Sequence, residues 1–414
     1  MKLNNLYTKS DTLFSLSIFL VLALLLSTNN GSVAIAGAAV LVSFLLIYRN
    51  REKIKLDNHD KIVIACLSAY AISNVPLVLL DWDNFRYFRG ASRVILCIPI
   101  YFSFKYFLNT KCIYIKPLVW GTILGSFGAF LFACYQHFVE GRLRVDGFLF
   151  SINFGYLACS LAVLALALLR YNILRTLLLV SFLFASTATL MTLTRGAIFA
   201  LPLVLALILI INIKRIGIKN FLFTSLGLSS LLIGSYFVSP QFQERLDFTI
   251  YEVTSITNGN VEQALSSGGR LLLWRAAFEA FKERPLIGLT HPERETLNRE
   301  LASQGVINDW AAGVKRGHAH SQYFDQLASG GILGIISVIF TLAVPFGYFF
   351  RFREKSDAAY VGCLFVFSFA LFCLTEVALQ QNLISTFYGY MLALFFAATQ
   401  LEINDNLVGA ETKQ

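Results

Sequence analysis

Long hydrophobic runs alternate with short polar segments along almost the whole chain. Roughly 20 apolar residues are needed for a helix to cross the hydrocarbon core of a bilayer, and about twelve runs approach that length. They lie near residues 12–29, 32–49, 62–80, 92–109, 116–138, 150–170, 174–193, 196–213, 220–238, 330–350, 359–376 and 383–400. Because an isolated segment in lipid must satisfy its own backbone hydrogen bonds, we expect an all-α polytopic membrane protein.

One long polar segment, 239–329, interrupts this pattern and divides the chain into membrane helices 1–238, a large loop 239–329, membrane helices 330–402 and a polar tail 403–414. The loop is expected to be helical. Apolar residues recur in it at three- and four-residue spacing, as in an amphipathic helix: Leu271, Trp274, Ala277, Phe278 and Phe281. This stripe is expected to pack on the membrane domain or lie at its interface, rather than grip lipid. Pro285 and Gly288 should end that helix, and Glu293–Glu300 should form a second one.

Composition agrees with the hydrophobic pattern. The 414 residues are 56% hydrophobic and 14% charged, with a mean hydropathy of +0.64, which excludes an ordinary soluble domain. A net charge of +9 could indicate nucleic-acid binding, but the basic residues lie mostly in short loops between apolar runs. Membrane topology and membrane lipids explain the charge better, so no nucleic-acid partner is expected.

The loops between the runs alternate in basic content, as the positive-inside rule requires. The richer set holds Lys2, Lys9, Arg49, Arg51, Lys53, Lys55, Lys61, Lys105, Lys111, Lys116, Arg170, Arg175, Lys214, Arg215, Lys219, Arg351, Arg353 and Lys355. The short loops of the opposite set hold only Arg86, Arg89, Arg93, Arg142, Arg144 and Arg195. We therefore expect both termini in the cytoplasm, a retained first helix, and the long loop outside, which is the periplasm in a bacterium with two membranes.

Candidate chemistry lies at this outer face. Arginine is costly near hydrocarbon, and Arg195 stands in a very short connection between two apolar runs, so a functional role is favoured over an anchor. Arg270 follows two glycines before the amphipathic helix, where first-turn amides and a guanidinium could form an anion pocket or simply face solvent. Arg89 and Arg93 lie in a basic-aromatic cluster that is either an interfacial belt or a lipid-headgroup site. Glu376 could pair with an arginine, orient a histidine or mark a helix end.

His318 and His320 are separated by one residue, so in a turn or extended segment both side chains should lie on one side. None of the seven cysteines lies in the long loop, and no zinc-type motif is present, so no metal is expected. A neutral imidazole is instead suited to accept a proton from a hydroxyl. With the arginines, these residues indicate a site that binds a pyrophosphate leaving group and deprotonates an acceptor hydroxyl.

Three motifs carry a resemblance to a known family. They are the Thr-Arg-Gly segment at Arg195, the Gly-Gly-Arg segment ending at Arg270, and His320-Ser321 followed by nine residues and then Gly331 and Gly334. With about twelve helices and a large outer loop before the tenth, the chain resembles the bacterial O-antigen ligase and polymerase superfamily of lipopolysaccharide biosynthesis.

The resemblance to the ligase branch implies a glycosyltransferase of the bacterial inner membrane with a periplasmic active site. It would transfer polysaccharide from undecaprenyl pyrophosphate to a hydroxyl of lipid A-core oligosaccharide, inverting and without metal or other cofactor. His320 would be the general base, and Arg195 and Arg270 would bind the pyrophosphate. His318 would be a neighbour or acceptor contact, and Glu376 falls where ligases can have an acidic residue.

Two alternatives remain at this stage. An O-antigen polymerase, or another transferase that uses the same lipid-linked donor, would share the chemistry and differ in its acceptor. A lipid or solute transporter should show inverted repeats and broken helices near mid-membrane, and the sequence shows neither. Protein partners cannot be inferred from the sequence.

Overall fold

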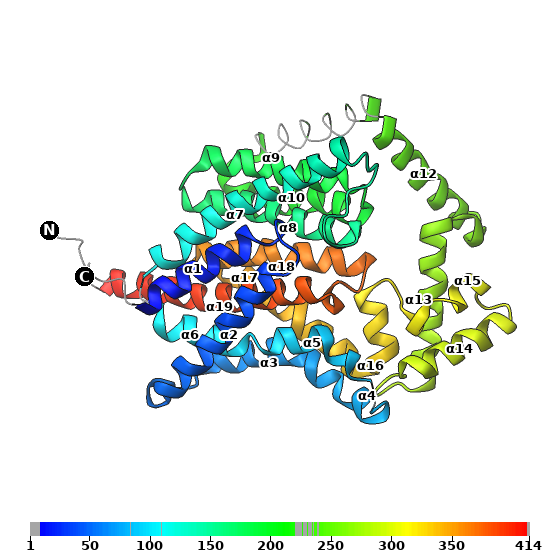
Figure 1. Ribbon diagram of the computed structural model, residues 1–414, viewed down its shortest axis with the longest axis horizontal. Helices are drawn as coiled ribbons and strands as arrows, with labels where there is room; N and C mark the ends of the chain where they lie inside the picture. Colours follow the sequence, from blue (N-terminus) through cyan, green and yellow to red (C-terminus); the bar gives the residue numbers. More distant parts are fainter. Residues whose placement is uncertain are drawn as a thin grey trace. The chain divides into compact units, whose positions relative to one another are not determined.

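The computed structural model describes residues 9–82, 84–108, 110–219, 226, 230, 234, 236–237 and 240–411. Most of the predicted run 220–238 therefore lies outside the described residues, as does Lys2. The described residues form helices and no strands (Figure 1). The chain divides into two compact units, of which the first comprises Met1–Leu201 with Ile335–Gln414, and the second Pro202–Gly334.

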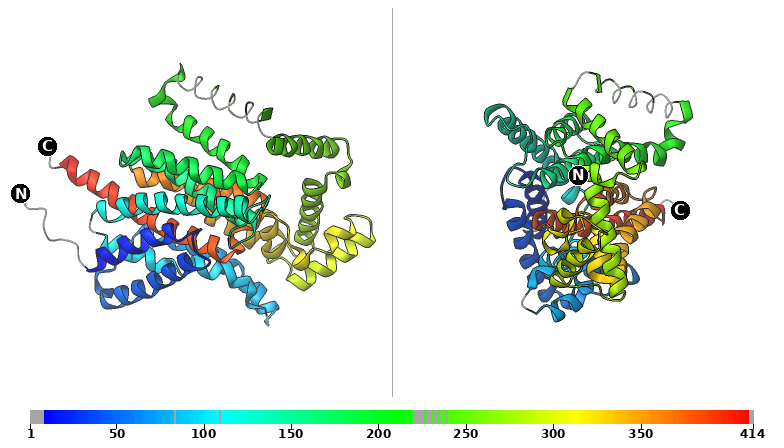
Figure 2. Two further views of the ribbon diagram at one scale, coloured as in Figure 1. Left: turned by 45° about the horizontal axis from the view of Figure 1, so that its top comes forward. Right: turned by 90° about the vertical axis from the view of Figure 1, so that its right-hand side faces the viewer.

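The first unit is a bundle of helices (Figure 2). Its α-helices are α1 (Lys9–Ala23), α2 (Gly31–Arg49), α3 (Asn58–Ser73), α4 (Val75–Leu80), α5 (Phe88–Ile95), α6 (Ile98–Phe107), α7 (Cys112–Cys134), α8 (Ser151–Leu168), α9 (Arg175–Met191), α17 (Val344–Phe352), α18 (Asp357–Thr375) and α19 (Asn382–Glu411). The π-helical segments η3 (Tyr135–Val139) and η7 (Ile339–Ala343) continue α7 and precede α17. Short 3₁₀ segments are η1 (Arg51–Lys53), η2 (Phe85–Tyr87), η4 (Leu169–Tyr171) and η8 (Ala378–Gln380).

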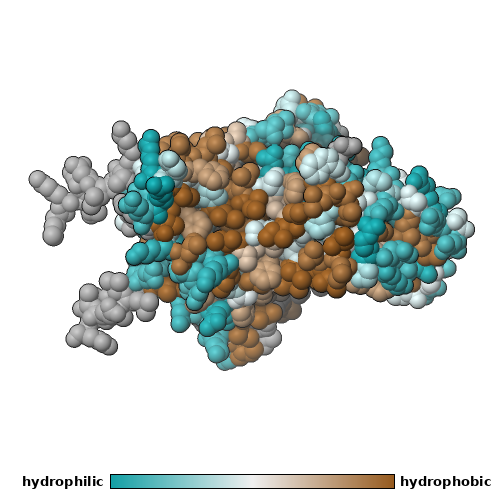
Figure 3. Space-filling model, turned by 90° about the horizontal axis from the view of Figure 1, so that it is seen from below, coloured by the Kyte–Doolittle hydropathy of each residue, from teal (hydrophilic) through white to brown (hydrophobic). Residues whose placement is uncertain are grey.

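The centre of this bundle is formed by α8, α18 and α19. Their apolar windows are 83%, 72% and 94% buried, whereas that of α2 is only 17% buried. α19 packs against α18 on one side and against α5 and α6 on the other. Hydrophobic side chains cover much of the face seen in Figure 3, and many large apolar side chains of these helices are exposed. This is the distribution expected of helices whose outer faces contact lipid.

Eight helices of the described residues are long and apolar enough to cross a membrane, and the helices around 10–23 and 175–191 are shorter apolar ones. The predicted run 92–109 is two helices, α5 and α6, separated at Leu96 and Cys97. Pro99 explains this break, because proline has no N–H to donate and its ring clashes with the carbonyl four residues earlier. The expectation of an all-α polytopic membrane protein is confirmed, and the count of twelve stays a prediction.

The basic loops of the first unit gather at one end of the bundle, which we call the basic end. Lys105 Nζ lies 2.7 Å from carboxylate oxygens of both Asp57 and Asp60. Arg170 pairs with Asp357 at 2.8 Å, linking the end of α8 to the start of α18. The other ends of these same helices lie at the opposite end, near residues 151 and 375. The alternation of basic and non-basic loops thus corresponds to the two ends of the bundle.

The second unit contains the predicted loop helices. They are α12 (Pro240–Thr257), η5 (Val261–Gln263), α13 (Leu265–Glu283), α14 (His291–Ser303), α15 (Asp309–Ala312), η6 (Lys315–Gly317) and most of α16 (Gln322–Val338). α10 (Arg195–Ile216) begins in the first unit and ends in the second. Both predicted loop helices are confirmed, since α13 ends before Pro285 and α14 covers Glu293–Glu300.

The apolar stripe predicted for α13 coincides only in part with the face that packs within the second unit. Ala277 is buried, but Phe278 is 48% exposed, with the Lys282 ammonium 4.9 Å from its ring centre. The face that packs inward carries Leu273 and Ala276, which form a core with α14 and α15. The small side chain of Ala276 permits this close packing, and neither Leu273 nor Ala276 belongs to the predicted stripe.

Candidate functional site

Arg195 is held at a tight turn of the first unit. α9 ends at Met191, and Leu193 has a φ of +50°, a conformation uncommon for a residue with a β-carbon. The Thr194 N–H donates to Thr192 Oγ1 at 3.2 Å, and the guanidinium of Arg144 donates to the Thr192 carbonyl at 3.0 Å. The turn therefore fixes where α10 begins, and Arg195 is its first residue.

Gly196 brings this turn against the end of α18. A β-carbon at Gly196 would collide with Thr375 Oγ1, which is itself 2.8 Å from the Tyr156 hydroxyl. The next residue, Glu376, is 7% exposed, and its Oε1 accepts the Val377 N–H at 2.9 Å. A buried carboxylate thus follows directly on the residue that contacts the Arg195 turn.

The arginines of α5 border the same segment. Arg89 Nε donates to Asn382 Oδ1 at 3.1 Å, and a β-carbon at Gly90 would collide with the Leu379 carbonyl. Arg93 lies one turn further along α5 and is half-buried. Within the first unit, residues 375–382 are therefore the common neighbour of the Arg195 turn and of α5. We call this region the arginine end of the bundle.

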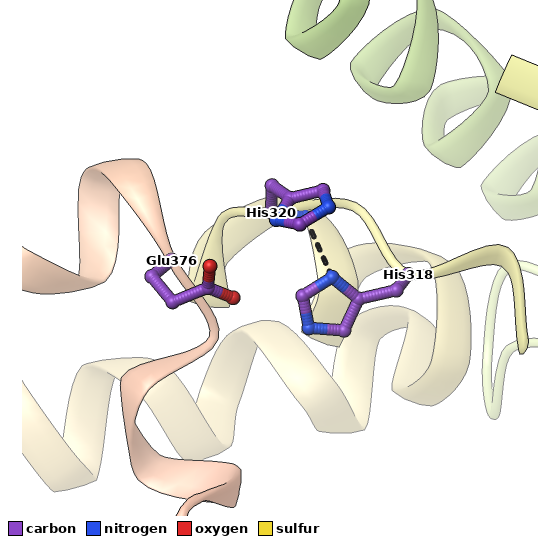
Figure 4. A group of neighbouring side chains, drawn as sticks. All are labelled: His318, His320 and Glu376. Carbon is purple, nitrogen blue, oxygen red and sulfur yellow. Dashed lines mark hydrogen bonds between the residues drawn. The ribbon is translucent and has the colours of Figure 1, made fainter. Parts of the chain in front are cut away.

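His318 and His320 occupy a short loop of the second unit, between η6 and α16. Their rings are neighbours, with centroids 4.5 Å apart at an angle of 79°. The His320 backbone N–H donates to His318 Nδ1 at 3.3 Å (Figure 4). Arg316, Gly317 and His320 all have positive φ, of 64°, 60° and 47°. The two side chains do lie together, as their spacing predicts, in a loop whose backbone is strained.

The glycines after the histidines produce a break within α16. Gly331 has φ 57° and ψ −138°, and a β-carbon there would collide with the Pro285 carbonyl. That carbonyl accepts the Ile332 N–H at 2.7 Å, and the Leu286 carbonyl accepts the Leu333 N–H at 3.3 Å. The glycine motif therefore lets the backbone carbonyls of residues 285–286 accept hydrogen bonds from α16 at its break. The helix itself begins at Gln322, before the glycines.

Arg270 lies in the second turn of α13. Its Nη1 is 3.5 Å from Ser266 Oγ, and its buried Nε has no hydrogen-bond partner among the residues that the structure describes. The first-turn amides expected to form an anion pocket are already occupied. Ser266 N–H and Ser267 N–H donate to Glu252 Oε1 at 2.7 Å and 3.1 Å, and Ser267 Oγ donates to Glu252 Oε2. The guanidinium of Arg270 thus remains a candidate, whereas the helix terminus does not.

The predicted residues therefore form one group in each unit. Arg89, Arg93, Arg195 and Glu376 lie at the arginine end of the first, and Arg270, His318 and His320 lie in the second. α13, which carries Arg270, also contacts the histidine loop, because Trp274 Nε1 donates to the Ala319 carbonyl at 3.1 Å.

Several residues around these groups were missed by the sequence reasoning. They are Arg144, Glu252, Trp274, Arg294 and Asp325. Trp274 was expected only as part of the apolar stripe and Arg144 only as a basic residue of a short loop, while Asp325 is an acidic residue shortly before a long apolar run. The others act through partners remote in sequence.

Comparison with known proteins bears on the same segments. Residues 180–339 match the family model described as O-antigen ligase. The match covers less than half of the chain, and it shows that this segment is similar to the O-antigen ligase superfamily. It includes Arg195, Arg270, His318 and His320, but not Arg89, Arg93 or Glu376. Members of this superfamily are glycosyltransferase-like membrane enzymes, either ligases or polymerases.

The chain is also similar along most of its length to an uncharacterized protein of Haemophilus influenzae strain Rd. The two are 22% identical over 384 residues, which is 89% of this chain and 93% of the relative. The aligned region includes residues of both units and covers most of each protein.

Proposed function

We propose that this protein is an O-antigen ligase of the bacterial inner membrane. It transfers polysaccharide from undecaprenyl pyrophosphate to a sugar hydroxyl of lipid A-core oligosaccharide on the periplasmic face. The observation that carries the proposal is the strained histidine loop within the segment that matches the O-antigen ligase family. Strain of this kind clusters at functional sites, where the surrounding structure must enforce it.

The reaction is a single displacement with inversion. An imidazole nitrogen of His320 accepts the proton of the acceptor hydroxyl as its oxygen attacks the anomeric carbon of the donor. The bond from that carbon to the pyrophosphate oxygen breaks, and its electron pair leaves with undecaprenyl pyrophosphate. Negative charge grows on the leaving group, and the guanidinium groups of Arg195 and Arg270 stabilise it.

The remaining candidates bind substrate. Arg89 and Arg93 contact the anionic part of a lipid-linked substrate at the arginine end, Glu376 helps to orient the site, and His318 supports His320. No metal or other cofactor takes part in this scheme. Activity should therefore survive treatment with a chelator, and a loss that zinc restores would contradict this part of the proposal.

The test is a deletion of the gene, complemented with wild-type protein or with His320→Ala, and scored on a lipopolysaccharide gel. Wild type should restore polymer on lipid A-core, and His320→Ala should restore none while the protein remains inserted at normal level. His59→Ala is a matched control, because His59 is an exposed histidine at the basic end of the first unit.

The alternative functions predict different lipopolysaccharide patterns on the gel. A single repeat unit attached to the core in the deletion strain would identify the protein as a polymerase. Full capping of lipid A-core by His320→Ala would contradict the role of His320 as base. Loss of capping while undecaprenyl-linked polymer still accumulates is the result expected of a ligase.

A further inference from the structure

A buried ion pair lies beneath the histidine loop. Arg294 on α14 and Asp325 on α16 are each 3% exposed at the side chain, and Arg294 Nη1 lies 3.0 Å from Asp325 Oδ1. The same Nη1 donates to Ser329 Oγ at 2.5 Å. Burying two charges carries a large desolvation cost before they attract one another. Two apolar side chains would fill the same space at less cost, so stability alone does not explain the pair.

Both charged groups also contact the backbone of the histidine loop. Arg294 Nη2 donates to the Gly317 carbonyl, just before His318. Asp325 Oδ1 accepts the Ala319 N–H at 3.2 Å, between the two histidines. The pair thus fixes the loop at two points, one on either side of His318.

Trp274 provides a third point. Its indole Nε1 donates to the Ala319 carbonyl at 3.1 Å, and its ring stacks on Phe324 at 4.6 Å with an interplanar angle of 8°. Both backbone groups of Ala319 therefore have side-chain partners, from α13 and from α16. Gly317 fits the same arrangement, since a β-carbon there would lie 2.9 Å from the β-carbon of Arg294.

We propose that Arg294, Asp325 and Trp274 are positioning residues that hold the loop so that His320 keeps its left-handed backbone conformation. Positive φ is unfavourable for a residue with a β-carbon such as His320, and these contacts hold the loop in that conformation. The inference rests on the proposed function, because it assigns these residues a role in the reaction of His320. They touch neither substrate nor the reacting atoms; they act through the loop backbone.

The decisive variant is Trp274→Phe. It removes the N–H that holds the Ala319 carbonyl and keeps an aromatic ring against Phe324. A displaced catalytic group loses rate steeply with distance, so kcat should fall about tenfold, with KM for the lipid-linked donor nearly unchanged. Purified enzyme in nanodiscs, with lipid-linked polysaccharide and lipid A-core, gives both constants. Trp120→Phe is the matched control, because Trp120 is a partly exposed tryptophan of α7 in the first unit.

Asp325→Asn tests the ion pair itself. The amide oxygen still reaches the Ala319 N–H, but the charge opposite Arg294 is lost, so kcat should fall by about 100-fold. Arg284→Gln is its control, because the Arg284–Glu293 pair at 2.7 Å is half-exposed and has no contact with residues 317–320 in the described hydrogen bonds. The control should leave both kinetic constants at wild-type values.

Thermal unfolding of each variant separates positioning from simple stabilisation. A fall in kcat per folded molecule supports the inference. A loss that follows the folded fraction, a rise in KM at constant kcat, or wild-type constants in both variants while His320→Ala is inactive would each overturn it. Wild-type activity in His320→Ala would instead overturn the proposed function. The two failures are therefore distinguishable.

Discussion

The backbone position of Arg195 is fixed by the turn before it rather than by contacts of its own side chain. The left-handed conformation of Leu193 and the contact of Gly196 with Thr375 leave the Arg195 backbone little freedom to move. A guanidinium can form two parallel hydrogen bonds to phosphate oxygens, and an ammonium cannot.

Arg195→Lys should therefore reduce transfer by at least about tenfold although it keeps the charge. The measurement is the amount of polymer on lipid A-core, compared at equal protein level on an immunoblot. Near-normal transfer would contradict a pyrophosphate-binding role and indicate that Arg195 only anchors the helix at the membrane.

The hydrogen bond from the His320 N–H to His318 Nδ1 predicts how His318 can be replaced. Nδ1 can accept this bond only when it carries no proton. Asparagine can place its oxygen near the position of Nδ1, whereas the oxygen of glutamine reaches further, toward the position of Nε2.

His318→Asn should accordingly retain more transfer activity than His318→Gln, by severalfold. Side-by-side complementation of the deletion strain measures the ratio. The reverse order would show that His318 acts through Nε2, as an acceptor contact.

At this scale the sequence pattern selected candidate residues but not the residues around them. Histidines and arginines stand out against apolar runs, so His318, His320, Arg195 and Arg270 could be proposed from the sequence, and their roles stay predictions. Arg294 and Asp325 are separated by 31 residues, and nothing local reveals their contact. The anion pocket at α13 failed for the same reason, because Glu252 reaches the Ser266 N–H from 14 residues away.

Among the elements, the break in α16 depends on Gly331. Its backbone conformation is one that only glycine adopts readily, and its missing β-carbon leaves room for the Pro285 carbonyl.

Gly331→Ala should lower the free energy of unfolding by about 1–3 kcal/mol or more, since strain and collision add. Thermal unfolding in detergent measures this loss. Gly347→Ala is the control, because a β-carbon at Gly347 in α17 has no neighbour within 4 Å and should cost nothing. Equal melting temperatures for the two variants would contradict this account of the break.

α14 begins at a capping box that makes its stability sensitive to acid. Burial raises the pKa of Glu293, but hydrogen bonds from Arg284, the Thr290 N–H and the Thr290 hydroxyl outweigh it and hold that pKa below its usual value. A carboxylate with a lowered pKa stabilises the fold above the unfolded value of about 4.3 and loses this contribution as pH falls toward the folded value.

Below pH of about 4.3, the wild type should therefore lose more stability than Glu293→Gln, which has no carboxylate to protonate. Melting temperatures of both proteins between neutral and acid pH provide the comparison. Parallel curves would show that Glu293 does not contribute.

The helical elements were the most predictable part of the fold. Apolar runs correspond to α2, α7, α8, α18 and α19, and turn residues located the end of α13. Breaks were less predictable, because Pro99 divides one predicted run into two helices and Gly331 stands inside a helix that begins before the predicted run 330–350. The face of α13 that packs within the second unit also uses Leu273 and Ala276, whose burial depends on what packs against them.

For the whole molecule, the positive-inside rule predicts that the basic end faces the cytoplasm. Cys112 at the start of α7 tests this, because it is exposed and its neighbour Lys111 pairs with Asp405 of α19 at 3.7 Å. Leu143, which is 83% exposed, precedes α8 at the other end of the bundle.

In intact spheroplasts, a membrane-impermeant maleimide should label Leu143→Cys and leave Cys112 unlabelled until the membrane is opened. Cys112→Ser gives the background from the other cysteines. Labelling of Cys112 in sealed spheroplasts would show that the orientation is the reverse of the predicted one. The arginine end would then lie in the cytoplasm, which contradicts the proposed function.

The left-handed conformation of His320 has a practical consequence. Asparagine tolerates positive φ better than alanine does and lacks a basic nitrogen. His320→Asn should therefore preserve the loop while stopping the reaction before proton transfer. This variant should bind both substrates without reacting. It is therefore the form to use for trapping the ternary complex.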